Sequence, residues 1–384
     1  MSLYLSFKEI LRYKGRFFLF SLVIALITIL VLFISGLAEG LANANREYLS
    51  KLDGELLVFQ SNVKLSTLSS RLDSSTLQKV KRIPGVADVG PVGLSSATLV
   101  FEDNREDVDI SLIGVEPEKP GGAPAREGSN LRLKSANETV IDGNLARSSD
   151  IEVGDTITVK SIQGTEEEYY DLEVIGISDG RQYFFQPSIF VSMEVWEKIR
   201  SQAAAGGENN PIAYNILVSR LQPGADPEAV ASEIESQIDD IEVSDIETAY
   251  KATPGYAAQQ STLNTQRGFT LLIGILVIGG FFQIQTLQKI PNIGMLKAIG
   301  TGNLTVGMAV VMQILMVTVF GVVLGTLATL GLAALMPAGI PILFTPLTTL
   351  AAMLSLTIIG PLGGLLSVYL AVKVEPLMAL GLSQ

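Results

Sequence analysis

The 384 residues of this chain include no cysteine and no histidine, so the commonest general base and the commonest transition-metal ligand are both missing. Their absence excludes a disulfide, a thiolate metal site, a Ser-His-Asp triad and an H-E-x-x-H zinc site. No phosphate-binding loop of the form G-x-x-x-x-G-K-[ST] occurs either, so any nucleotide energy has to come from another polypeptide. The sequence therefore favours a binding or transport role, with no catalytic and no metal-binding residues assigned.

One candidate binding site lies where two long apolar stretches end. Glu39 follows the first of these stretches, and Met336 ends the third. Phe33 and Leu37 are one helical turn apart and would share a face below Glu39. These four residues could hold an amphiphile against an apolar wall with a carboxylate at its edge. The alternative is that Glu39 is a solvated helix end and that Met336 fills a packing gap.

Four uncharged stretches of membrane-spanning length must position these residues. They occupy residues 17–38, 268–287, 304–336 and 347–372. About 20 mainly apolar residues cross a bilayer core, so each stretch is predicted to be a transmembrane helix. The chain is thus expected to be an α-helical membrane protein with one span, a large α+β domain at 39–267, and three more spans.

Lysine and arginine near the ends of the spans give the predicted orientation, because these residues accumulate on the cytoplasmic side. Four of them precede the first span, two lie between the second and third, and one follows the fourth. Both termini are therefore predicted to be cytoplasmic, with the large domain outside. That domain contains 37 of the 39 acidic residues and 20 of the 27 basic ones. This excess of negative charge argues against a nucleic-acid partner and against a domain that lies flat on anionic lipids.

The exterior domain has the pattern of a mixed α and β fold. A strand, a helix and a second strand are predicted within 55–92, and the same order recurs within 212–243. Two β-α-β units separated in sequence are typical of a split ferredoxin-like layer. The part between them, at about 117–205, is turn-rich and contains short strand patterns, so it is predicted to be a β-rich insertion.

The spans themselves are rich in small residues and poor in charge. Glycines spaced four apart, at Gly36 with Gly40 and at Gly321 with Gly325, allow helix backbones to approach closely. Pro361 is expected to kink the fourth span. Ion and proton pathways usually hold charged side chains within the bilayer, and these spans have almost none. This favours an amphiphile taken from the membrane over a hydrated ion as a transported substrate.

The remaining segments are short. Residues 1–16 interleave apolar and basic side chains, which predicts a basic amphipathic helix on the inner membrane surface or, alternatively, an ordinary positive flank of the first span. Residues 288–303 form a cytoplasmic loop, residues 337–346 an outer loop, and residues 373–384 a cytoplasmic tail.

The loop after the second span resembles the same segment in permeases of the MacB/FtsX type, the mechanotransmission class (type VII) of ABC transporters. The core that carries the resemblance is Gly294-x-x-Lys297-Ala298-Ile299-Gly300. The end of the chain, Lys373-Val-Glu-Pro-Leu-Met-Ala-Leu380, is similar to the terminal motif of the family. The one-plus-three order of spans and the split β-α-β character of the exterior domain also match.

The resemblance implies that a short cytoplasmic helix at 288–303 docks on a separate ABC ATPase subunit. Ile293, Leu296 and Ile299 can form one apolar face of such a helix, with Lys297 projecting elsewhere. The coupling residues implied are Ile293, Gly294, Leu296, Lys297, Ala298, Ile299 and Gly300. The resemblance further implies a homodimer of this chain in the lipid bilayer, two copies of the ATPase, and ATP bound on that partner.

Within that class, residues 31–41 and 287–300 look closest to the permeases of haem-exporting pairs. This resemblance implies removal of haem from a bacterial cytoplasmic membrane, with haem as a transported substrate and no permanently bound cofactor. An iron ligand from this chain would have to be methionine, tyrosine or a carboxylate, because histidine and cysteine are missing.

Two functions of different classes remain open. The first is an ATP-driven exporter of a membrane-partitioned amphiphile, with haem as the leading candidate and a lipid or an antimicrobial peptide as alternatives. The second is a mechanotransmission subunit that moves no substrate and operates an exterior partner. An apolar cavity between the first and second spans would favour transport, whereas an exposed apolar patch on the exterior domain would favour a partner. A membrane-anchored enzyme is the weakest interpretation, since paired acids such as Asp239 and Asp240 are explained more simply as a solvated turn.

Overall fold

The computed structural model describes residues 8, 12, 14–101, 105–132, 137–201, 213–253, 255–336 and 342–374. The chain forms two compact units. We call Met1–Gly40 with Gln260–Gln384 the membrane unit and Leu41–Gln259 the exterior unit. Most of the predicted helix at 1–16, part of the outer loop at 337–346 and the terminal motif after Val374 lie outside the described residues.

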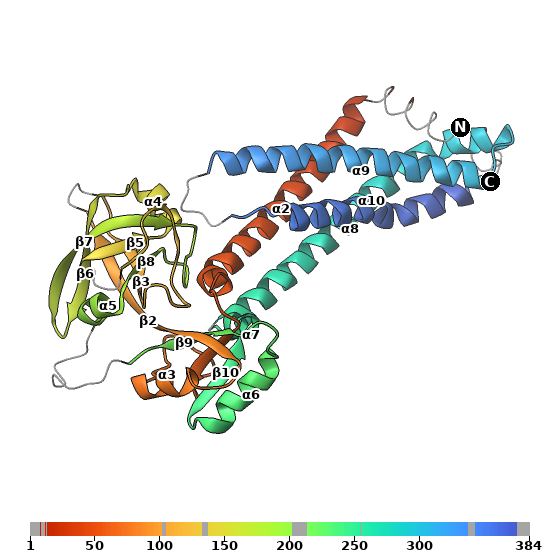
Figure 1. Cartoon of the computed structure of the whole chain (residues 1–384). Helices are drawn as coiled ribbons and strands as arrows, with labels where there is room; N and C mark the ends of the chain where they lie inside the picture. The colour runs from red at the N-terminus through yellow and green to blue at the C-terminus, as the bar shows by residue number, and fades with distance from the viewer. Residues whose placement is uncertain are drawn as a thin grey trace. The chain divides into compact units, whose positions relative to one another are not determined.

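The membrane unit is built on four long helices (Figure 1): α2 (Lys14–Ser50), α8 (Tyr256–Ala298), α9 (Asn303–Ala334) and α10 (Pro346–Lys373). Among the described residues these four are long and apolar enough to cross a membrane. The predicted arrangement of one span followed by three is therefore confirmed. Two helices extend past the predicted spans, because α2 continues beyond residue 38 to Ser50 and α8 begins at Tyr256, ahead of residue 268.

Glycines bring these helices into backbone contact. For α9 this agrees with the close approach predicted from the four-residue spacing of Gly321 and Gly325. A Cβ added to Gly325 of α9 would lie 2.6 Å from the carbonyl oxygen of Ala25, and one added to Gly321 would lie 2.7 Å from Cβ of Ile24. On the other side of the bundle, a Cβ on Gly279 of α8 would lie 2.7 Å from the carbonyl oxygen of Gly363. The helices can lie this close only because these positions carry no side chain.

The C-terminal end of α8 differs from the expected separate helix at 288–303. Helix α8 continues through Pro291 to Ala298, and a turn then leads to Asn303 at the start of α9. Pro291 removes one backbone donor, but Ile293 just beyond it packs against Val306 of α9 and Ala371 of α10. This burial holds the last turns in line with the rest of the helix. Helix α10 likewise runs through Pro361 without interruption.

The exterior unit contains the predicted split ferredoxin-like layer. Strands β10, β1, β9 and β2 lie side by side in that order, and every neighbouring pair is antiparallel. This is the order that two interlocked β-α-β units produce. The elements are β1 (Leu56–Gln60), α3 (Ser74–Val80), β2 (Val86–Val100), β9 (Ile216–Leu221), α6 (Pro227–Gln237) and β10 (Ile241–Asp245), followed by α7 (Ile246–Ala252).

The β-rich insertion begins inside β2, earlier than the predicted start at 117. The first half of this long strand pairs with β9, whereas Val92–Leu99 pair with β3 and carry the sheet into the insertion. Trp196 packs across this junction, directly over Gly93 and Gly114. The insertion consists of β3 (Val108–Val115), β4 (Ala125–Gly128), β5 (Glu138–Ile141), α4 (Gly143–Ser149), β6 (Thr156–Gln163), β7 (Glu166–Ser178), β8 (Ser188–Ser192) and α5 (Met193–Ile199).

Candidate functional site

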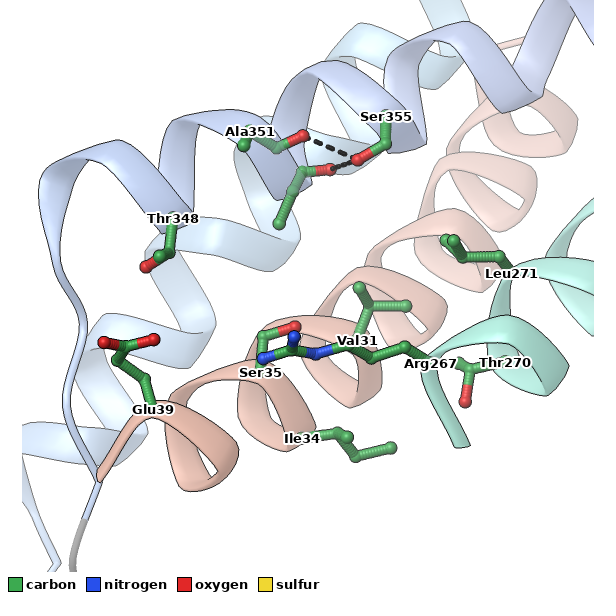
Figure 2. A pocket seen from close by; sticks show the side chains of 11 residues that line it. Val31, Ile34, Ser35, Glu39, Arg267, Thr270, Leu271, Thr348, Ala351 and Ser355 are labelled. Carbon is green, nitrogen blue, oxygen red and sulfur yellow. Dashed lines mark hydrogen bonds between the residues drawn. The ribbon is translucent and has the colours of Figure 1, made fainter. Parts of the chain in front are cut away.

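A cavity of about 260 Å³ lies among α2, α8 and α10 of the membrane unit (Figure 2). It lies close to the outer ends of the predicted spans. Its lining includes Glu39, the first residue after the first predicted span, and Arg267, the last residue before the second. The residues that line it are Val31, Ile34, Ser35 and Glu39 of α2, Arg267, Thr270 and Leu271 of α8, and Thr348, Ala351, Ala352 and Ser355 of α10.

The walls of this cavity combine apolar side chains with hydroxyl groups and two charged side chains. Val31 of α2, Leu271 of α8 and Ala352 of α10 supply apolar surface. Two of the hydroxyl groups are already engaged within their own helices, because Thr270 donates to the carbonyl oxygen of Gln266 and Ser355 to that of Ala351. The charged side chains come from the outer parts of their helices, Glu39 on α2 and Arg267 on α8. This is the arrangement expected for a ligand with an apolar body and a polar head.

Arg267 is the feature of the site that the sequence reasoning missed. Figure 2 shows its side chain extending from α8 toward Ser35 and Val31 of α2. Its Nε–H is buried and has no hydrogen-bond acceptor among the described residues. In the sequence it lies one residue before the predicted second span, within the predicted exterior domain. An arginine on the outer side of a span runs against the usual cytoplasmic bias, and that departure was the signal available.

Of the four residues predicted to bind substrate, the structure brings only Glu39 into the cavity. Its carboxylate lies at the outer end of the lining, on the side of Thr348 (Figure 2). Phe33 and Leu37 are half-buried on α2 but do not line the cavity, and Met336, after the end of α9, does not line it either. On α2 the lining instead includes Ile34 and Ser35.

The predicted coupling residues divide into a buried and an exposed set. Ile293 and Gly294 are buried, whereas Leu296 is 41% and Ile299 80% exposed. The three apolar side chains thus do not form one continuous outer face. Ala298 and Gly300 are also exposed at this end of α8. The exposed set remains open to a partner at the tip of the helix.

Lys297 has a structural contact that the sequence did not indicate. Its ammonium group donates hydrogen bonds to the carbonyl oxygens of Val372 and Val374. These carbonyls lie at the end of α10, where helix carbonyls lack intrahelical donors and a cation is favoured. Lys297 therefore joins the tip of α8 to the end of α10.

A cluster of charges in the exterior unit fastens the last turns of α2 to the segment after β7. Lys51, directly after the end of α2, lies 3.0 Å from Glu47 and 3.5 Å from Asp179. Arg181 donates through Nε to Asp179 at 2.7 Å, and its Nη1 donates to the carbonyl oxygen of Lys51 at 2.8 Å. Helix α2 is thus anchored in the exterior unit by charge-assisted hydrogen bonds.

Two carboxyl groups in this cluster have perturbed pKa values of opposite sign. Burial raises the pKa of Asp142, although backbone N–H groups of Asn144 and Arg181 donate to its carboxylate. Burial also acts to raise the pKa of Asp179, but Arg181 and Lys51 outweigh it and hold that pKa below its usual value. Among the described residues no group of three or more metal-ligating side chains occurs, Asp239 and Asp240 included. The ion pairs and hydrogen bonds of Lys51, Asp179 and Arg181 hold the end of α2 against the segment after β7.

The chain combines a bundle of apolar helices with a split ferredoxin-like exterior domain, which is the architecture of a membrane protein with a large exterior part. Two family descriptions match the chain: the MacB-like periplasmic core domain over residues 17–237 and the FtsX-like permease C-terminal domain over residues 268–376. The chain belongs to the MacB/FtsX family of ABC transporter permeases. It is therefore a membrane protein with a large extracellular domain, and its class works with an ATPase partner.

Relatives of known name extend over nearly the whole chain. A protein named as the hemin transport system permease HrtB of Staphylococcus haemolyticus is 29% identical over 98% of this chain and 99% of its own length. Its namesake in Staphylococcus epidermidis strain ATCC 35984 is 25% identical with the same coverage.

Two solved structures are similar to parts of the chain. The extracellular domain of the ABC-type transporter YknZ from Gram-positive bacteria covers 50% of this chain and 98% of its own, with 15% identity and a TM-score of 0.35. The periplasmic region of MacB from Actinobacillus actinomycetemcomitans covers 51% and 90%, with 14% identity and a TM-score of 0.36.

Proposed function

We propose that this chain is the permease subunit of an ATP-driven exporter that removes an amphiphile from the membrane, with haem as the leading substrate. The observation that carries the proposal is the cavity among α2, α8 and α10, which has apolar walls and charged groups at its outer end. An amphiphile in the outer leaflet would enter with its apolar body between the helices and its polar head at the interface.

The relatives support haem as the leading substrate. Proteins named for hemin transport match this chain over nearly its entire length. At about 260 Å³, the cavity is somewhat smaller than the roughly 300–1,000 Å³ of a drug-sized ligand site. A single chain would therefore enclose only part of a porphyrin, and a second copy in a homodimer would complete the site.

Energy would enter at the cytoplasmic end of α8. The exposed Leu296 and Ile299 would contact the ATPase subunit, and Lys297 would pass a displacement to the end of α10. Two of the three cavity walls would then move together. In this proposal both termini are cytoplasmic, two ATPase copies bind ATP, and the chain itself holds no permanent cofactor.

The proposal is tested with the permease and its ATPase subunit reconstituted in lipid discs. ATPase activity is titrated with haem, an unrelated amphiphile and a phospholipid. Ala352→Trp fills the cavity, while Ile358→Trp places the same side chain on the exposed face of the same helix as a matched control. Saturable stimulation by haem that Ala352→Trp alone abolishes would support haem export. Stimulation by another amphiphile in place of haem would identify a different substrate. No stimulation by any amphiphile would refute the proposed export function.

A second function is favoured by a specific feature of the exterior unit. Phe184 and Phe185 are 38% and 43% exposed at a tight turn in which Tyr183 and Gln186 exchange backbone hydrogen bonds. Both have left-handed backbones, with φ of 51° and 65°, at positions where glycine or asparagine is usual. Aromatic side chains held outward in this way suit an exterior protein partner. If no amphiphile stimulates the ATPase, Phe184→Asn with Phe185→Gly is the variant expected to release such a partner.

A further inference from the structure

Arg267 has one donor, Nε–H, whose hydrogen-bonding requirement no described residue meets. Its Nε–H is buried without an acceptor, and it has no ion-pair partner among the described residues. A buried donor without an acceptor is costly, and a charged one more so. Natural structures rarely keep such a group unless something else supplies the acceptor.

The place of Arg267 indicates what supplies it. Its side chain lies along the cavity, which has Val31 and Leu271 as apolar walls. A guanidinium group offers several donors in a planar fork that matches a carboxylate or phosphate. The site thus combines an anion receptor at the membrane interface with an apolar slot below it.

We infer that the cavity selects amphiphiles with an anionic head, and that Arg267 is the residue that binds this head. The inference rests on the proposed export function and adds the class of substrate. In the bound state the acidic group lies between Arg267 and Ser35, while the apolar body extends toward Val31 and Ala352. Neutral analogues of the same shape enter the slot but leave the guanidinium unpaired, so they bind more weakly.

Glu39 lies at the rim of the same cavity. Because a carboxylate attracts cations, it suggests the opposite selectivity, for an amphiphile with a cationic head. Two observations favour the anionic head. Glu39 already interacts with another part of the chain, whereas the described residues provide no partner for Arg267. Glu39 also lies one turn further out than Ser35, toward Thr348, so it borders the entrance and not the depth to which Arg267 reaches. The Glu39 carboxylate disfavours anions at the rim, but the Arg267 guanidinium deeper in the cavity stays available to bind an anionic head.

The test uses ligand pairs that differ only in charge. Haem is compared with its dimethyl ester, and laurate with methyl laurate, by direct binding to the full-length permease in zwitterionic lipid discs. Hydrogen bonds to a charged group are expected to give the acids roughly 10- to 100-fold tighter binding. Arg267→Gln should remove this preference by weakening the acids alone, and Arg267→Lys should keep part of it. Lys251→Gln removes an exposed exterior cation and serves as the control.

The outcomes separate this inference from the proposed function. Binding of the esters by Arg267→Gln shows that the variant is folded and that the slot is intact. Equal binding of acid and ester by the natural chain would overturn the role of Arg267 while leaving export intact. Failure of every amphiphile to bind would refute both. Phosphatidylglycerol added to the discs distinguishes the source of the anion, because competition with the acids in the natural chain but not in Arg267→Gln would identify a lipid phosphate as the bound head.

Discussion

Replacement of Gly325 by alanine tests whether α9 is held against α2 by glycine contacts. The added Cβ would lie 2.6 Å from both the carbonyl oxygen of Ala25 and Cβ of Thr28. Ordinary contact begins at 3.4 Å, so the two helices must separate by roughly 0.8 Å. Strain of this kind in a packed core costs about 1–3 kcal/mol. One obstructing atom is a backbone oxygen and the other is a Cβ, which is fixed to the backbone. Rotation of a side chain therefore cannot relieve the contact.

Gly331 provides the matched control on the same helix. A Cβ there meets nothing within 4 Å. Both substitutions remove a helical glycine and gain the same helix propensity of up to about 1 kcal/mol, so the difference between the variants isolates the contact with α2.

Thermal unfolding in lipid discs, followed by circular dichroism, gives the measurement. At about 2–4 °C for each kcal/mol, Gly325→Ala should melt several degrees below Gly331→Ala. Equal midpoints would show that α9 does not lie against α2 at this position.

The coupling segment and the exterior anchor give three further predictions. Ile299→Glu should weaken ATPase binding several-fold in a pull-down without a change in melting midpoint, and unchanged binding would remove Ile299 from that surface. Lys297→Met should leave the last carbonyls of α10 without their donor at a cost of about 1–3 kcal/mol, seen as faster hydrogen exchange at 370–374. Asp179→Asn should destabilise the exterior unit more at pH 7 than at pH 3, while Asp142→Asn should gain relative stability as the pH rises; parallel profiles for the two variants would contradict the assigned shifts.

The opposite signs of the two pH effects follow from the direction of each pKa shift. The folded pKa of Asp179 is below the unfolded value of 3.8, so its contribution to stability is present above that pH and is lost on acidification. The folded pKa of Asp142 is above 3.8, so its contribution is complete below that pH and is lost as the pH rises through the folded value.

Patterns of short range account for most of what the sequence predicted about the fold. Uncharged stretches gave the four membrane helices, because bilayer thickness imposes a length that is visible in one dimension. Asp226 followed by Pro227 gave the start of α6, where the Asp226 side chain accepts from the backbone of Glu228. The continuation of β2 past Val92 was not visible, since it depends on pairing with β3, which comes later in the chain.

The candidate site was less accessible to sequence reasoning for the same reason. The position of Glu39 at the end of the first span predicted its depth in the membrane. It did not predict which face of α2 meets α8 and α10. That choice depends on how the helices rotate to bring their glycines together. The sequence does not single out Arg267, because a charge at the end of a span looks like an ordinary flank. Only the structure shows that its buried Nε–H has no acceptor among the described residues. The anchor of Lys51, Asp179 and Arg181 joins residues about 130 positions apart, and no local pattern marks it.

The glycine contacts also limit the cavity on its inner side. On α8 the cavity ends at Leu271, and eight residues deeper Gly279 meets Gly363 of α10. On α2 it ends at Val31, while residues deeper in the bilayer are covered by Gly321 and Gly325 of α9. The helices are therefore in close contact at mid-depth, and space remains only toward their outer ends. A tilt about these contacts would change the volume of the cavity without separation of the bundle.

This geometry predicts where a crosslink should stop turnover. The natural chain has no cysteine, so introduced pairs react alone. A short thiol crosslinker across the cavity, in Ser35→Cys with Ala351→Cys, should abolish stimulated ATPase activity, because it prevents the outer ends from moving. The pair Phe20→Cys with Phe281→Cys, at a ring contact on the inner side of the cavity, should be tolerated. Equal inhibition by both pairs would mean that the whole bundle must separate, and a pivot at the glycines would be wrong.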